Sequence, residues 1–160
     1  MELLRVLHSL TRWAVVIVAL AVTIYMLLGL VQKKPFVKLG NTLMSVFGGL
    51  VGLQWIIGVL FLLDWGGRVG FGQRHFWEHA FAMTLALVAA HAYVAWKRRD
   101  IPDQARYRNN LLAVLATFGF IFVGVLSLPD FMRWRAYLPS GGDAPATIQE
   151  APAEATEAAN

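Results

Sequence analysis

The sequence predicts an all-α integral membrane protein, an antiparallel bundle of four transmembrane helices, from three observations. Hydrophobic residues make up 58% of the 160-residue chain, whereas soluble domains contain roughly 45–50%. They gather in four blocks, each close to the ~20 residues that cross a bilayer. Lys and Arg concentrate between the blocks, as in loops that flank membrane spans. The predicted transmembrane helices cover residues 3–31, 41–63, 75–96 and 111–128.

The composition excludes several kinds of site. The chain contains no cysteine, which excludes a disulfide, a thiolate metal site and covalent haem attachment. The net charge of +4 is explained by the basic loops, and no aromatic and basic pattern typical of nucleic-acid binding occurs. The lipid bilayer is therefore the predicted partner, no nucleic acid is expected, and any cofactor must be bound by His, Met, carboxylate or backbone groups.

The first predicted helix, residues 3–31, is expected to be retained, because it is too long and uninterrupted for a cleaved signal sequence. His8 and Arg12 lie four residues apart near its start and therefore share one face. Two interpretations are open. The pair belongs to a polar site inside the bundle, or Arg12 extends to the lipid headgroups with His8 beside it at the interface.

The second predicted helix, residues 41–63, begins after a loop in which Pro35 ends the first helix. One face of this helix carries small residues that allow a second helix, or a partner membrane subunit, to approach closely. These residues are Ser45, Gly48, Gly49 and Gly52. Gln54 and Gly58 lie on another face, and we expect the Gln54 side chain to form an interhelical hydrogen bond with Arg12. The glycines of the following loop, residues 64–73, follow no strand, which excludes a nucleotide-binding loop.

The third predicted helix, residues 75–96, carries Glu78, His79 and His91. An ionisable side chain inside a bilayer costs at least about 2.5 kcal/mol for the charged types, so each such group is a functional-site hypothesis. Glu78 points about 100° away from His79 around the helix. We expect its carboxylate to pair with Arg12 or Arg74, or to orient an imidazole.

The fourth predicted helix, residues 111–128, contains Gly124. After it, a short segment places aromatic side chains on one side and arginines on the other, which is typical of a helix lying in the membrane interface. From Pro139 onward Ala, Pro, Glu and Thr dominate, which predicts disorder. Residues 1–138 therefore form the predicted transmembrane domain, and residues 139–160 form a disordered tail.

The distribution of basic residues predicts the orientation of the bundle. Loop 32–40 contains three Lys or Arg residues and loop 97–110 contains five, whereas the segments after the second and fourth helices contain two each. The positive-inside rule places these two loops in the cytoplasm and both termini outside.

Helix geometry brings four residues to one depth. With a rise of ~1.5 Å per residue, they lie ~6–7 Å below the outer surface: His8, His79, Gly58 and Gly124. Arg12 and Gln54 both fall ~13 Å below that surface. Imidazoles on two alternate helices and glycines on the other two could hold a flat haem with two axial His ligands. The same groups could equally form a hydrogen-bonded layer that locks the helices together.

Other uses of these residues are less well supported by the sequence. No Ser/His/Asp set and no H-E-x-x-H motif occurs, so no independent catalytic activity is predicted. A metal site formed by His75, Glu78 and His79 is an alternative. His91 is rotated ~120° from His79 around the helix, which argues against a second haem on the same axis, although Met44 lies at its depth. We expect His91 to hydrogen-bond a neighbouring helix near the cytoplasmic surface.

Several short motifs together resemble a family of small bacterial four-helix membrane proteins that are often labelled cytochrome B. The motifs are His8-Ser9-x-x-Arg12-Trp13, Gln54, Arg74-x-x-x-Glu78-His79, Ala90-His91, Arg108-Asn109-Asn110 and Gly124-Val125-x-x-Leu128-Pro129. The resemblance covers residues 3–132. It implies a b-type haem carried by the bundle, with His8 and His79 as the iron ligands.

Together these observations predict a membrane electron carrier, or a haem-bearing subunit of a membrane redox complex, in the bacterial inner membrane. His8 and His79 would bind the iron of a single haem b near the outer face. Arg12 would neutralise a haem propionate, while Gln54 and Glu78 would support the ligands and Gly58 and Gly124 would leave room for the ring. The alternative is a haem-free accessory subunit whose polar layer only fixes helix packing.

Overall fold

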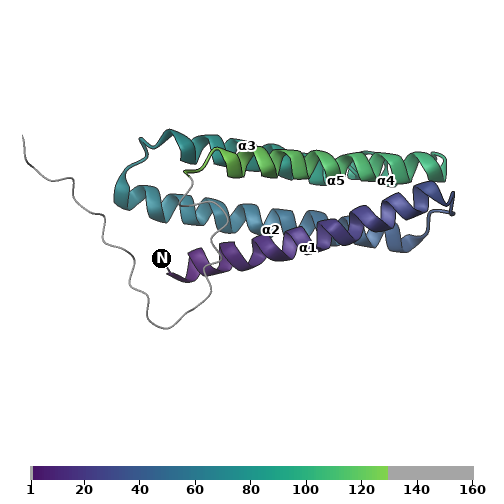
Figure 1. The fold of residues 1–160 in the computed structure, drawn as a ribbon, viewed down its shortest axis with the longest axis horizontal. Coiled ribbons are helices and arrows are strands. Elements are labelled where there is room, and N and C mark those ends of the chain that lie inside the picture. Colours follow the sequence, from purple (N-terminus) through teal and green to yellow (C-terminus); the bar gives the residue numbers. More distant parts are fainter. Residues whose placement is uncertain (1, 130–160) are drawn as a thin grey trace, which may run out of the picture.

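The computed structural model describes residues 2–129, and within them it is all-helical, with no strand. Four long helices and one short helix follow one another along the chain (Figure 1). They are α1 (Glu2–Val31), α2 (Lys38–Val69), α3 (Arg74–His91), α4 (Val94–Lys97) and α5 (Asp103–Leu126). The predicted all-α fold with four long helices is confirmed. The predicted interfacial helix and tail lie outside the described residues.

Four helical segments are long and apolar enough to cross a membrane. They are Glu2–Val31, Lys38–Val69, Arg74–Lys97 and Asp103–Leu126. Their apolar side chains do not all face inward: Ile17, Leu20 and Ile24 on α1 are each more than half exposed. Large apolar side chains exposed in this way are unusual on a soluble monomer and mark surfaces that meet protein or membrane.

Each long helix packs mainly against two others. Helix α1 contacts α2 and α5, and α3 contacts α2 and α5. Consequently α1 lies diagonally opposite α3, and α2 lies diagonally opposite α5. Figure 1 shows α3 beside α5 in one layer and α1 beside α2 in the other. Residues that point inward from α1 and α3 therefore face one another across the bundle.

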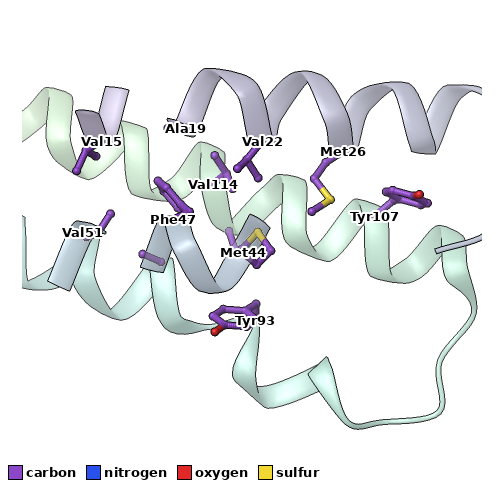
Figure 2. Packing of buried hydrophobic residues seen from close by; sticks show 12 residues of the cluster. Val15, Ala19, Val22, Met26, Met44, Phe47, Val51, Tyr93, Tyr107 and Val114 are labelled. Carbon is purple, nitrogen blue, oxygen red and sulfur yellow. The ribbon is translucent and has the colours of Figure 1, made fainter. Parts of the chain in front are cut away.

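The apolar core occupies the middle of the bundle and the end nearest the α1–α2 connection (Figure 2). Helix α1 supplies inward side chains at helical spacing, and α2 supplies three more. These core residues are Val15, Ala19, Val22 and Met26 of α1, and Met44, Phe47 and Val51 of α2. Helix α3 buries only small side chains, Ala82, Ala86 and Ala90, and small residues allow helix backbones to approach closely.

Helix α2 is longer than the sequence predicted, at both ends. It starts at Lys38 instead of residue 41 and continues to Val69 instead of residue 63. The predicted loop 64–73 is therefore wrong over its first six residues. Arg68 donates a hydrogen bond to Asp64 one turn earlier at 3.0 Å, and the ring of Phe71 occupies the space that a side chain at position 66 would need. The helix ends at Gly70, whose φ of 89° favours glycine.

The third and fourth predicted helices also differ from the structure. The third is interrupted by a turn at Ala92 and Tyr93, between α3 and α4. Helix α5 begins at Asp103 instead of residue 111. The Arg106 side chain stabilises this earlier start, because it donates hydrogen bonds to the carbonyl groups of Lys97 and Arg99 in the preceding segment. The predicted loops 32–40 and 97–110 are consequently shorter in the structure.

Candidate functional site

Two histidines face one another near the start of α1 and α3. His8 and His79 are both half-buried and extend from diagonally opposite helices. The two imidazoles are close enough to interact electrostatically, and each also interacts with Arg12. The structure therefore brings together the two side chains that the sequence proposed as a pair.

Each imidazole lies against a glycine of an adjacent helix. A Cβ atom added at Gly58 of α2 would lie 3.1 Å from Cε1 of His8. A Cβ atom added at Gly124 of α5 would lie 3.5 Å from Nδ1 of His79 and would overlap the terminal methyl group of Met83. The four residues therefore share one level of the bundle. The space at these glycines is filled by the two imidazoles, Met83 and Ala82, so the prediction that it is free for a ring is not met in this structure.

The orientation of His79 is set by the backbone of α5. Its Nδ1 atom lies 2.7 Å from the carbonyl oxygen of Gly124. A carbonyl oxygen only accepts hydrogen bonds, so Nδ1 carries the proton. The Nε2 atom then presents its lone pair and has no hydrogen-bond partner among residues 2–129. Metal-binding histidines typically donate the other ring N–H to a carbonyl or carboxylate in this way.

Gln54 of α2 connects to α1 beside His8. Its amide nitrogen donates to the carbonyl oxygen of His8 at 3.0 Å and lies 3.2 Å from each ring nitrogen of that residue. Its amide oxygen accepts a hydrogen bond from the hydroxyl group of Thr11. Thr11 was not among the predicted site residues, although its place three residues after His8 puts both on one helix face.

The hydrogen-bond partners of Gln54 and of Arg12 both differ from those that the sequence predicted. Gln54 bonds Thr11 and His8, so the expected hydrogen bond between Gln54 and Arg12 is wrong. The Arg12 guanidinium group instead lies 3.5 Å from the hydroxyl group of Ser9 and 5.7 Å from the centroid of the neighbouring Trp13 ring. A small error in the rotation of a helix about its axis is enough to exchange such partners.

Glu78 turns away from the histidine layer. Its carboxylate accepts a hydrogen bond from Nε of Arg74 at 2.5 Å, and its side chain is 42% exposed. Of the roles predicted for Glu78, pairing with Arg74 is confirmed. The alternative metal site with His75 and His79 is not formed, because no group of three potential metal-binding side chains occurs in the described part of the chain.

His91 is exposed and belongs to the opposite half of the bundle. Its Nδ1 atom donates to the carbonyl oxygen of Leu87 in its own helix at 3.0 Å, so the expected hydrogen bond to a neighbouring helix is wrong. The ring nevertheless lies against Gly48 of α2. Met44 is fully buried in the core. In the described part of the chain no atom lies within 4 Å of a Cβ added at Gly49, so only part of the predicted small-residue face is in contact among residues 2–129.

The fold and the site together define an all-helical bundle with four membrane-length helices and a histidine pair across one end. No protein-family model, curated protein or solved structure matches this chain.

The link between α1 and α2 predicts a difference between two threonines of α1. The hydroxyl oxygens of Thr11 and Thr23 each lie 2.8 Å from the carbonyl oxygen four residues earlier, but only the Thr11 hydroxyl group also reaches the amide oxygen of Gln54. Replacing Thr11 with valine is expected to lower the free energy of unfolding by about 0.6–1.7 kcal/mol, the range for interhelical hydrogen bonds in membranes. Thr23→Val should change it by less. Equal effects in a detergent unfolding titration would contradict this assignment of the hydrogen bond.

Proposed function

We propose that the chain is an antiparallel four-helix protein of the bacterial inner membrane that binds one b-type haem and carries electrons near the outer face. The observation that supports this most directly is the His8 and His79 pair on diagonally opposite helices, with Nε2 of His79 available and Nδ1 held by Gly124. Bis-His ligation between facing helices is a common way to hold haem in a bundle. This function corresponds to the family that the sequence motifs resemble.

Insertion in the bilayer is supported by the exposed apolar side chains of all four long helices. Orientation is supported by the lysines near the connections at one end of the bundle. Lys33, Lys34 and Lys38 lie at the α1–α2 connection, and Lys97 ends α4. The positive-inside rule assigns this end to the cytoplasm. The histidine layer then lies in the outer leaflet, and successive long helices cross the membrane in opposite directions.

The residues of the layer fit the proposed ligand roles. The hydrogen bond to Gly124 keeps the His79 imidazole in one orientation, with Nε2 as the ligand atom. On the other side of the layer, the Gln54 side chain contacts both the backbone carbonyl group and the ring of His8. Arg12 places a positive charge beside both imidazoles, where it would neutralise a propionate. Haem, when bound, supplies one-electron redox chemistry.

Space for the ring depends on Met83. Its terminal methyl group occupies the position beside Gly124 that a side chain there would need. Methionine has three rotatable bonds and readily changes shape to suit its surroundings. A rotamer change of Met83 would therefore widen the space beside Gly124 on one side, whereas the Cβ atom of Ala82 would remain 3.0 Å from the position of an added Cβ.

The test is the visible spectrum of the full chain, purified from haem-replete cells. We expect a b-type α-band in the reduced-minus-oxidised difference spectrum. Haem extracted as its pyridine complex should amount to one per chain. A folded but colourless preparation, which also takes up no added haemin, would contradict the proposal.

The second candidate function is a haem-free accessory subunit of a membrane complex. It is favoured by the same layer, because the Thr11–Gln54–His8 and His79–Gly124 contacts already join neighbouring helices. The exposed surface at Gly49 would then receive a helix of a partner subunit. A colourless protein that co-purifies with a defined membrane partner, and loses it in Gly49→Leu, would support this second candidate.

A further inference from the structure

A shallow surface cavity of about 450 Å³, open to its surroundings over much of its extent, lies at the end of the bundle away from the histidine layer. It lies between the first two turns of α2 and the end of α4. Its lining consists of Lys38, Asn41, Thr42, Ser45 and Val46 of α2 with Lys97 of α4. Along α2 the cavity is separated from Gly58, at the histidine layer, by ~20 Å. It is therefore distinct from the proposed haem site.

Lys97 is held in place at the wall of this cavity. Its ammonium group donates to the hydroxyl oxygen of Ser45 at 3.3 Å and lies 5.5 Å from the centroid of the Tyr93 ring. The hydroxyl group of Tyr93 donates to the same oxygen at 3.1 Å. Ser45 in turn donates its own hydrogen to the carbonyl oxygen of Asn41 at 2.9 Å. The hydrogen-bonding capacity of Ser45 is thus used, and Lys97 keeps further N–H groups for another partner.

The lining carries positive charge without a carboxylate. Within residues 2–129 the ion pairs are Arg5–Glu2, Arg68–Asp64 and Arg74–Glu78, and none involves Lys38 or Lys97. The Thr42 hydroxyl group donates to the carbonyl oxygen of Lys38 at 3.3 Å. Two lysines and Asn41 therefore line this space, and no acidic residue is among its lining residues in the described part of the chain. An anion with several acceptor oxygens would match these donors.

The apolar surface beside the cavity indicates that the anion carries a hydrocarbon chain. Val46 lines the cavity and is 48% exposed. One turn further along α2, Gly49 leaves open surface, and the adjoining Leu53 is 45% exposed. A hydrocarbon chain could follow this surface away from the charged end. Basic pockets between membrane helices on the cytoplasmic side bind anionic lipid headgroups in other proteins.

We propose that this cavity is a phosphate-binding site that takes the headgroup of an anionic phospholipid of the cytoplasmic leaflet. The phosphate oxygens accept from Lys38 and Lys97, and the acyl chains lie along Val46 and Gly49. The site does not depend on haem, and a colourless protein would still bind the lipid. Free phosphate and soluble phosphate esters carry the same phosphate group as the lipid headgroup. The experiment below distinguishes binding of the lipid from binding of a soluble phosphate.

The test titrates the detergent-purified full chain with phosphatidylglycerol, phosphatidylcholine or inorganic phosphate, with bound ligand counted by native mass spectrometry. We expect phosphatidylglycerol to bind more tightly than phosphatidylcholine, whose choline ammonium group is repelled by the lysines. In the double variant K38Q/K97Q the dissociation constant for phosphatidylglycerol should rise by at least about tenfold, consistent with attraction of basic residues to anionic lipid.

The matched control is K33Q/K34Q, which removes the same charge from the same end of the chain outside the cavity lining. Its dissociation constant should change by less than about twofold, because these residues do not line the cavity. Equal losses in both double variants, or no phosphatidylglycerol or phosphate binding by the wild type, would overturn the proposal. Tight binding of inorganic phosphate that depends on Lys38 and Lys97 would support the site and assign it to a soluble anion.

A single variant tests the site even if the double variant does not fold. The Lys38 side chain is exposed and makes no side-chain hydrogen bond within the described part of the chain, so K38Q is expected to fold normally. It should weaken phosphatidylglycerol binding by about threefold or more. Unchanged binding in K38Q, with K97Q also unchanged, would overturn the assignment.

Discussion

Under the proposed haem-binding function, replacing His79 with alanine is expected to abolish the b-type absorbance of the purified protein. The His79 imidazole interacts electrostatically with His8 of the diagonally opposite helix, and its Nε2 atom is the proposed ligand. Loss of one axial ligand leaves the other histidine alone, and the bound haem should fall from one per chain to less than about a tenth. The measurement is the pyridine complex of extracted haem, normalised to protein.

The control is His75→Ala, one helical turn earlier. The His75 ring packs edge-on against the Phe76 ring, with 4.3 Å between the ring centroids, and it faces no other histidine. Replacing His75 should therefore leave the haem content unchanged. His8→Ala should repeat the loss seen in His79→Ala. Circular dichroism of each variant should show the wild-type helix content, which establishes that the variants are folded. Full haem occupancy in His79→Ala would contradict the ligand assignment.

Replacing Gly29 with valine is expected to lower the free energy of unfolding more than Thr11→Val does. A Cβ atom at this position of α1 would overlap the ring of Tyr107 from α5. That ring cannot easily move, because Tyr107 is only 2% exposed, packs edge-on against Phe36 at 4.9 Å and donates to the carbonyl oxygen of Pro35 at 3.2 Å. Overpacking of this kind costs about 1–3 kcal/mol.

The matched control is Gly49→Val on α2, where an added Cβ meets nothing within 4 Å. Both variants place a β-branched residue inside a helix, so the helix-propensity terms cancel in the comparison. The free energy of unfolding, measured by denaturant titration in detergent, should fall in Gly29→Val and stay near the wild-type value in Gly49→Val. An equal loss in both would show that the contact with Tyr107 does not determine the effect.

The level at which His8, His79, Gly58 and Gly124 meet could be predicted from the sequence. It follows from the regular rise of an α-helix combined with short connections, which place the starts of alternate helices at the same end. The rise per residue does not predict how far each helix is rotated about its own axis. For this reason the partner of Gln54 was mispredicted, and Thr11 was missed.

The lengths of α2 and α5 could not be predicted from local composition. Glycines near the end of α2 indicated a loop, yet the Phe71 ring packs on Gly66 and the helix continues to Val69. The early start of α5 depends on Arg106, whose side chain reaches carbonyl groups of the preceding segment. Both outcomes depend on contacts made only after the chain has folded back on itself.

The sequence by itself determined the helical class, the four membrane-length segments and the common level of the two histidines along the bundle, because hydrophobic runs and helix rise depend only on neighbours along the chain. Only the tertiary structure decided the partners of Gln54, the outward turn of Glu78, the filling of the glycine spaces and the cavity beside Lys97. These features depend on how each helix is rotated against its neighbours. That rotation is set by side-chain packing between segments far apart in the sequence, such as Tyr107 against Gly29.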